Sequence, residues 1–164
     1  MRIFSRNLLY LAILLLSIDS YANCSSKQHR AFDFWLGNWQ VTTSTDEIIR
    51  KNKISLINNG CTLLEEYSTP SGYIGKSLNI YDASTKRWHQ TWTDSLGLLL
   101  KLEGNLVGKS MVMQGKGKDQ NNNKIINKIT WTPNSDGTVR QLWQTSADKG
   151  KTWVTVFDGL YTKI

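Results

Sequence analysis

Apolar and polar residues alternate along the chain from residue 38 onward, and this alternation constrains the fold more than any other feature. A period of two places successive side chains on opposite faces of a strand. Turn residues interrupt the pattern at roughly 8–12-residue intervals, which is typical of β-sandwiches and β-barrels. The sequence therefore predicts ten strands: Asn38–Ser44, Glu47–Ile57, Cys61–Ser68, Gly75–Tyr81, Arg87–Thr93, Leu96–Glu103, Lys109–Gly115, Lys124–Thr132, Thr138–Ser146 and Thr152–Tyr161.

Ten short strands joined by tight turns predict an all-β protein with an antiparallel, up-and-down arrangement. Closing such a sheet into a barrel removes both exposed edges, so a barrel is favoured over an open sheet. A short helical turn is expected first, because Phe32, Trp35 and Leu36 have helical spacing and Gly37 follows them. The polar connection Lys116–Asn123 is expected to be the most mobile part of the sheet.

Residues 1–22 are interpreted as a secretory signal peptide. Arg2 and Arg6 precede the apolar run Leu8–Leu16, and Ser20-Tyr21-Ala22 forms a small-x-small cleavage site. The apolar run is shorter than the roughly 20 residues that a membrane-spanning helix needs, so no transmembrane segment is expected after cleavage. An uncleaved anchor is the alternative. Residues 23–164 are then expected to form a single β-barrel domain that is secreted or periplasmic.

Cys24 and Cys61 are expected to form a disulfide, because an exported chain folds in an oxidising compartment. Two cysteines and the distant His29 and His89 offer no metal site, and no cofactor-binding motif is present. The net charge is +7, with basic residues scattered along the chain. An exported protein meets little nucleic acid, so weak contact with an anionic envelope surface, or simply solubility, is the role left to this charge.

The segment Phe32-Asp33-Phe34-Trp35-Leu36-Gly37-Asn38-Trp39 resembles the first motif of the calycins, which include lipocalins and fatty-acid-binding proteins. In calycins a helical turn precedes a G-x-W motif, whose tryptophan closes the barrel floor beneath a basic side chain from a late strand. Gly37 and Trp39 match this motif. The resemblance implies that Arg140, in the ninth predicted strand, packs over Trp39 and contributes roughly 0.5–2 kcal/mol.

Nearly the whole chain after residue 22 also resembles an uncharacterised family of exported bacterial proteins. Tyr67 departs from the tryptophan that is more usual in that family. The resemblance implies a lipocalin-like barrel and no particular activity. The residues that carry this resemblance are the segment 32–39 and then Gly60-Cys61 with Leu63, Glu65 and Tyr67, Ser77, Asn79, Tyr81-Asp82, Trp88-His89-Gln90-Thr91-Trp92 with Asp94, Thr130-Trp131-Thr132-Pro133, Val139-Arg140-Gln141-Leu142-Trp143 and Phe157-Asp158-Gly159-Leu160-Tyr161.

The segment 146–153 looks like the Asp-box, S-x-D-x-G-x-T-W, that is familiar from sialidases. A sialidase propeller needs several copies, and this chain has one, so we interpret the motif as a structural staple of the last hairpin. Asp148 is expected to accept backbone N–H bonds, Gly150 to adopt a positive φ and Trp153 to pack beneath the turn.

Strand alternation also identifies a candidate binding face. Its residues combine large aromatic rings with amides, hydroxyls and one carboxylate, which is the composition that a ligand cavity uses to orient a guest. The alternative is that they form the wet outer face of a closed sheet. The predicted ligand-binding residues are Glu65, Tyr67, Asn79, Tyr81, Gln90, Trp92, Gln141 and Trp143.

The sequence thus predicts an exported lipocalin-like barrel that binds a small, partly apolar molecule in its interior. Two alternatives remain open. One is an envelope enzyme of unknown reaction that uses Glu65 or another cavity acid with Tyr67 or Tyr81 as acid–base groups, and the sequence identifies no catalytic residue. The other is a protein-binding envelope module that acts through its loops. A raised pKa of an inward carboxyl is the feature that favours the enzyme.

Overall fold

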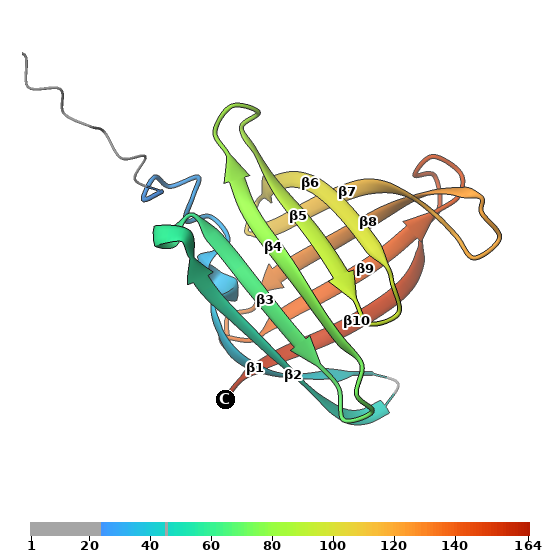
Figure 1. Cartoon of the computed structure of the whole chain (residues 1–164), viewed down its shortest axis with the longest axis horizontal. Coiled ribbons are helices and arrows are strands. Elements are labelled where there is room, and N and C mark those ends of the chain that lie inside the picture. The colour runs from blue at the N-terminus through green and yellow to red at the C-terminus, as the bar shows by residue number, and fades with distance from the viewer. Residues whose placement is uncertain (1–23, 45) are drawn as a thin grey trace, which may run out of the picture.

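The computed structural model describes residues 24–44 and 46–164, so the expected signal peptide lies outside the described residues. Within this part of the chain, ten strands form a closed antiparallel barrel. Each strand pairs with the next along the chain, and β1 closes the barrel on β10 (Figure 1). The predicted all-β, up-and-down, calycin-like fold is therefore confirmed.

The strand boundaries agree with the predicted ones to within a few residues at most ends. A 3-10 turn, η1 (Asp33–Trp35), precedes the barrel, and a second, η2 (Asn58–Gly60), joins β2 to β3. The strands are β1 (Gly37–Thr43), β2 (Asp46–Ile57), β3 (Thr62–Ser68), β4 (Ile74–Asp82), β5 (Arg87–Asp94), β6 (Leu99–Val107), β7 (Ser110–Lys118), β8 (Lys124–Pro133), β9 (Val139–Ser146) and β10 (Val154–Lys163).

Two strands begin at least two residues later than predicted because a carboxylate holds the preceding turn. Asp94 Oδ1 accepts the backbone N–H groups of Leu96 and Leu98, so β6 begins at Leu99 instead of Leu96. Asp148 Oδ1 accepts the N–H of Thr152 in the same way, and β10 begins only at Val154. A side-chain acceptor that captures an N–H competes with the strand ladder for that donor.

Residues of one parity face the barrel interior and residues of the other face solvent. In β4 Ser77 and Asn79 are almost fully buried, whereas Leu78 and Ile80 are 49% and 41% exposed. The polar set therefore lies inside this part of the barrel and the aliphatic set lies outside, which is the reverse of an ordinary hydrophobic core. This part of the interior therefore holds hydrogen-bonding groups.

Aromatic side chains fill one end of the barrel. Phe32 and Trp35, three residues apart in the 3-10 segment, stack with their ring centroids 5.0 Å apart. Three residues per turn places both rings on the same side, where they enter the barrel and meet Trp131 at 5.2 and 5.4 Å. Trp39 donates its indole N–H to the Trp35 carbonyl at 2.8 Å. This end is therefore closed by residues 24–36, here called the plug, which form the blue segment beside β1 and β2 in Figure 1.

The predicted disulfide is present between Cys24 and Cys61, with the two Cα atoms 5.0 Å apart. It ties the beginning of the plug segment to the residue that precedes β3. Arg30 adds a hydrogen bond to the carbonyl of Gly60 in the same connection. Within the described residues, no helix has the length and apolar character needed to cross a membrane.

The expected cover of Trp39 by Arg140 is wrong. Arg140 lies on the outer face of β9 and forms two hydrogen bonds with Asp158 of β10, at 2.7 and 2.6 Å. The cation near the Trp39 ring is Lys163, whose Nζ lies 5.3 Å from the ring centroid. Trp39 and Lys163 are register partners across the seam between β1 and β10, so barrel closure brings them together. Gly37 and Trp39 occupy the expected positions at the start of β1.

Candidate functional site: a cavity inside the barrel

A cavity of about 210 Å³ lies inside the barrel, on the other side of Tyr161 from the plug. Its wall is mainly aromatic, and its polar lining groups include one carboxyl and two amides. None of the lysine, arginine and histidine side chains in the described part of the chain lines it. The lining residues are Glu65, Tyr67, Tyr73, Gln90, Trp92, Leu100, Ile129, Gln141, Trp143, Val156, Phe157 and Tyr161.

A larger, open hollow of about 1120 Å³ adjoins the cavity, because Trp143 and Val156 line both spaces. The turn after β5 and the β7–β8 and β9–β10 hairpins form this hollow, at the end of the barrel opposite the plug (Figure 1). Its wall is largely apolar, and its charged lining residues are Lys116, Lys118, Asp119, Lys124 and Lys149. The cavity therefore has a closed, polar inner end and an open, basic outer end.

A chain of hydrogen bonds across β3, β4 and β5 ends on Glu65. The Gln90 amide donates to Asn79 Oδ1 at 2.9 Å, and the Asn79 amide donates to Ser77 Oγ at 2.8 Å. The Ser77 hydroxyl donates to Glu65 Oε2 at 2.6 Å, and the Asn52 amide of β2 donates to Glu65 Oε1 at 2.8 Å. Every donor in this chain points toward the carboxyl, so the network orients Glu65 as an acceptor.

Glu65 is 3% exposed, and burial raises the pKa of its carboxyl to about 7. The hydrogen bonds from Ser77 and Asn52 pull that pKa downward, but burial outweighs them. A carboxyl with this pKa changes its charge near neutral pH, whereas an exposed glutamate is ionised throughout that range.

Tyr161 of β10 forms the floor of the cavity and joins its two sides. Its hydroxyl donates to Gln141 Oε1 of β9, and its oxygen lies 3.5 Å from the Asn52 amide nitrogen. Burial, reinforced by the nearby Glu65 charge, raises the pKa of the Tyr161 phenol well above its usual range. Tyr161 is therefore a neutral hydrogen-bond donor at physiological pH.

Two glycines make room for the aromatic wall. A Cβ at Gly75 would lie 2.1 Å from the Trp92 ring, and one at Gly159 would lie 2.5 Å from the Phe157 ring. The missing side chains let each ring lie against a strand backbone. At the mouth, Asp94 Oδ2 accepts hydrogen bonds from the Tyr73 hydroxyl at 2.8 Å and from the Trp92 indole at 3.3 Å. Trp92 is thus held from both sides.

The structure places six of the eight predicted ligand-binding residues around the cavity: Glu65, Tyr67, Gln90, Trp92, Gln141 and Trp143. Asn79 is fully buried behind this lining and holds Gln90 and Ser77 in place. The part of these seven residues in ligand binding stays a prediction.

Tyr81 does not line the cavity, which corrects its predicted place. It lies at the plugged end of β4, with its ring centroid 5.0 Å from His29 and 6.2 Å from Trp88. Tyr81 shares a strand face with Asn79, but each further pair of residues moves about 7 Å along a strand. Parity therefore assigns a side chain to the interior without assigning its depth there.

Several lining residues were not predicted from the sequence, of which Tyr161 and Phe157 matter most to the wall. Asn52, which does not line the cavity but donates to Glu65, was not predicted either. Phe157, Gly159 and Tyr161 alternate along β10, and the same parity argument that found Trp143 could have found them. Asn52 was detectable as a polar residue that alternates with Ile54 on the inner face of β2. Nothing in the sequence indicated that Asn52 and Glu65 would hydrogen-bond across strands.

The Asp-box hairpin has the expected structural geometry and lies outside the cavity. Asp148 accepts hydrogen bonds from the Thr152 N–H at 2.9 Å, the Thr152 hydroxyl at 2.7 Å and the Ser146 hydroxyl at 2.8 Å. Gly150 has φ +90°. Trp153 packs under the ammonium group of Lys128, whose Nζ lies 3.7 Å from the ring centroid. These contacts are those of a stapled turn.

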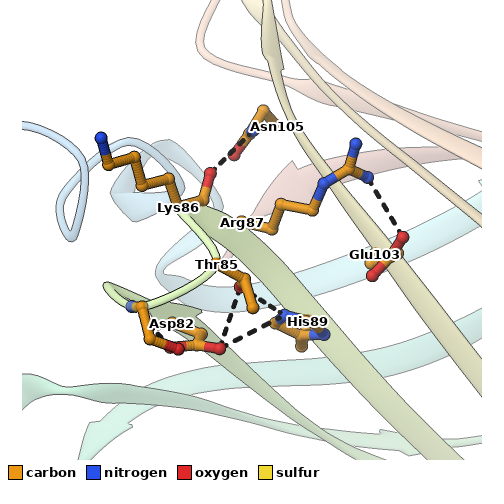
Figure 2. A network of polar contacts seen from close by, with 8 residues as sticks. Asp82, Thr85, Lys86, Arg87, His89, Glu103 and Asn105 are labelled. Carbon is orange, nitrogen blue, oxygen red and sulfur yellow. Dashed lines mark hydrogen bonds and ion pairs between the residues drawn. The ribbon is translucent and has the colours of Figure 1, made fainter.

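The outer face of β5 carries a separate polar network (Figure 2). His89 Nε2 lies 3.2 Å from Thr85 Oγ1 and 4.0 Å from Asp82 Oδ2. Arg87 pairs with Glu103 of β6 at 3.2 Å. His89 alternates with the inward Trp88 and Gln90, so its ring points away from the cavity and takes no part in that site.

No protein-family model matches the chain, and no curated protein matches it. The geometry of the cavity therefore carries the functional interpretation. Within residues 24–44 and 46–164, no three histidine, cysteine, aspartate or glutamate side chains gather in a way that could hold a metal ion.

Proposed function

We propose that this protein is an exported, calycin-like carrier that binds a small, partly apolar molecule in the barrel cavity. The observation that carries this proposal is the aromatic-walled cavity with polar groups at its inner end and an open hollow at its outer end. A few placed polar groups among aromatic rings are typical of small-molecule sites. A protein-binding module would have less use for an unfilled interior.

The size of the cavity limits the guest. Apolar cavities of about 150 Å³ accept a benzene ring, so a cavity of about 210 Å³ has room for one aromatic ring with a short substituent. A longer guest would extend past Trp143 and Val156 into the outer hollow. Stacking on Trp92 or Trp143 would remove water from these indoles.

Native mass spectrometry of the protein purified after export tests the proposal. We expect the folded protein to carry a small molecule that is released on unfolding. In Trp92→Ala the fraction of protein that carries a guest should fall at a temperature where the variant is still folded. Thr91→Ala, on the exposed side of the same strand, should leave that fraction unchanged. Gly75→Ala is a second variant, because the added Cβ would push the Trp92 ring out of place.

The proposal is wrong if the wild-type protein carries no guest and its tryptophan emission does not respond to small aromatic probes. Equal loss of occupancy in Trp92→Ala and Thr91→Ala would also contradict it, because the effect would then not depend on the cavity wall.

A second candidate function rests on Glu65. A buried carboxyl with a pKa of about 7, in a cavity that a small molecule can enter, has the properties of a general acid–base group. Glu65 could accept a proton from a guest, and the Gln141 amide, whose Oε1 accepts the Tyr161 hydroxyl, could donate an N–H to that guest. Chemical change of a bound guest in the wild type, abolished in Glu65→Gln while the guest still binds, would identify an enzyme.

A further inference from the structure

Glu65 is a buried carboxyl that lines the cavity without a cationic partner. Its two hydrogen-bond donors, Asn52 and Ser77, are neutral, and among the described residues no basic side chain lines the cavity. Burying a carboxylate without a counter-charge is costly. A guest that brings a positive charge to Glu65 would offset this cost.

The other polar groups around Glu65 also favour a donor-rich guest. The buried Asn52 Oδ1 has no hydrogen-bond partner among the described residues. The indole N–H groups of Trp92 and Trp143 are already directed to Asp94 and to Asn127. The cavity therefore offers the Glu65 carboxyl as an acceptor, whereas the two indole N–H groups of its wall are already used.

The aromatic wall provides the second requirement for a cation. Tyr67, Trp92, Trp143, Phe157 and Tyr161 surround the space next to Glu65. The faces of these rings attract positive charge, most strongly where water is excluded. An aromatic enclosure with one carboxylate is thus complementary to an organic ammonium group.

We infer that the guest has a protonated amine at its inner end, bound by Glu65, and a small aromatic or aliphatic body against Trp92, Trp143 and Phe157. This inference rests on the proposed binding function and names the chemical class of the ligand. The four lysines of the outer hollow do not line the cavity, and their exposed charges are screened by salt over roughly 10 Å.

Three probes of similar shape and different charge test the inference: 2-phenylethylamine, 2-phenylethanol and phenylacetate. Each is titrated into the protein by calorimetry, with tryptophan emission as a second readout. We expect the amine to bind at least about tenfold more tightly than the alcohol, since a charge-assisted hydrogen bond replaces a neutral one. We expect phenylacetate to bind most weakly, because a second carboxylate would face Glu65.

Glu65→Gln should remove the preference for the amine and leave the affinity for the alcohol within about threefold. Glu66→Gln is the matched control, because Glu66 is the next residue along β3, faces outward and pairs with Lys76 at 2.9 Å. It should leave all three affinities unchanged.

A pH series on the wild type tests the same point without a substitution. The amine affinity should rise between pH 6 and 8, roughly in proportion to the ionised fraction of Glu65. The other titratable groups that face this space are Tyr67, Tyr73 and Tyr161, with Asp94 at the mouth. Burial raises the pKa of the Tyr73 and Tyr161 phenols, and hydrogen bonds from Tyr73, Leu98 and Leu96 outweigh burial and lower the pKa of Asp94, so these three groups keep their charge in this range.

The outcomes separate the two proposals. If the alcohol or phenylacetate binds as tightly as the amine, or if Glu65→Gln leaves the amine affinity unchanged, the ligand class is wrong and the binding function stands. If none of the probes binds the folded wild type and no guest accompanies the purified protein, both proposals fail.

Discussion

Glu65 links the stability of the barrel to pH. Its carboxyl has a pKa of about 7 in the folded protein, against an ordinary value of 4.5. The folded state therefore holds this proton more tightly than the unfolded state does. The resulting stabilisation is fully present below about pH 4.5 and is lost as the pH rises through 7.

We expect the free energy of unfolding of the wild type, relative to Glu65→Gln, to fall by about 2–3 kcal/mol between pH 5 and pH 8. The glutamine variant has no proton to lose at this site, so its stability lacks the corresponding slope. Urea unfolding at several pH values measures the difference. Glu66→Gln is again the control and should run parallel to the wild type over this range. Parallel curves for Glu65→Gln as well would show that the Glu65 pKa is ordinary.

Asp148 acts on one turn only. Hydrogen bonds from Thr152 and, to a smaller extent, from Ser146 lower the pKa of its carboxyl to about 2. The stabilisation by Asp148 is therefore complete at neutral pH and is lost only as the pH falls below about 4. Asp148→Ala should lower Tm without changing the affinity for any guest. Asp148→Asn keeps one acceptor oxygen, so its Tm should lie between those of the wild type and the alanine variant. A change in guest affinity at unchanged Tm would contradict the structural role of this motif.

At the scale of elements, the disulfide fixes the plug segment to the barrel wall. Cys24 and Cys61 are 37 residues apart in sequence, and closing a loop of this length removes about 4 kcal/mol of unfolded-state entropy in the chain-entropy model. Cys24→Ser should therefore lower the free energy of unfolding by a few kcal/mol. Ser25→Ala, at the exposed neighbouring position, is the control. The claim fails if the protein purified under oxidising conditions contains two free thiols.

The seam between β1 and β10 gives a second test at this scale. Trp39 is fully buried and donates its indole N–H to Trp35, so Trp39→Ala should cost about 3–5 kcal/mol. Arg140→Ala should cost less than about 1 kcal/mol, because Arg140 takes part in an exposed ion pair with Asp158. Thermal unfolding of both variants decides between the two placements. A large effect of Arg140→Ala would restore Arg140 as the cover of Trp39.

At the scale of the whole molecule, positive charge gathers at the open end of the barrel, where the outer hollow also exposes Leu98 and Leu99. We expect the protein to sediment with phosphatidylglycerol vesicles at low salt and to be released at about 0.5 M salt, where screening is strong. Replacing the four lysines of the hollow with glutamine should abolish sedimentation. The control variant, of equal charge, replaces Lys27, Lys53, Lys86 and Lys109. Equal binding of both variants would mean that net charge alone is responsible.

Much of the fold was predictable because its determinants are local. Alternation along each strand identified ten strands, and the turn residues separated them. The same parity placed Glu65, Gln90 and Trp92 on the inner face, because it depends only on neighbouring residues. Strand ends were less predictable where a carboxylate in the turn, such as that of Asp94, accepts hydrogen bonds from the backbone N–H groups that follow it.

The sequence by itself thus determined the strands, their inward faces and the pairing of its two cysteines, since each follows from local pattern or from the small number of choices. Only the tertiary structure decided how deep in the barrel each inward side chain lies and which side chains it contacts. Tyr81 shares parity with Asn79 and yet lies at the plug, and Lys163 rather than Arg140 meets Trp39. The network that ends on Glu65 spans four strands, so its geometry depends on barrel closure and register, which no single segment encodes.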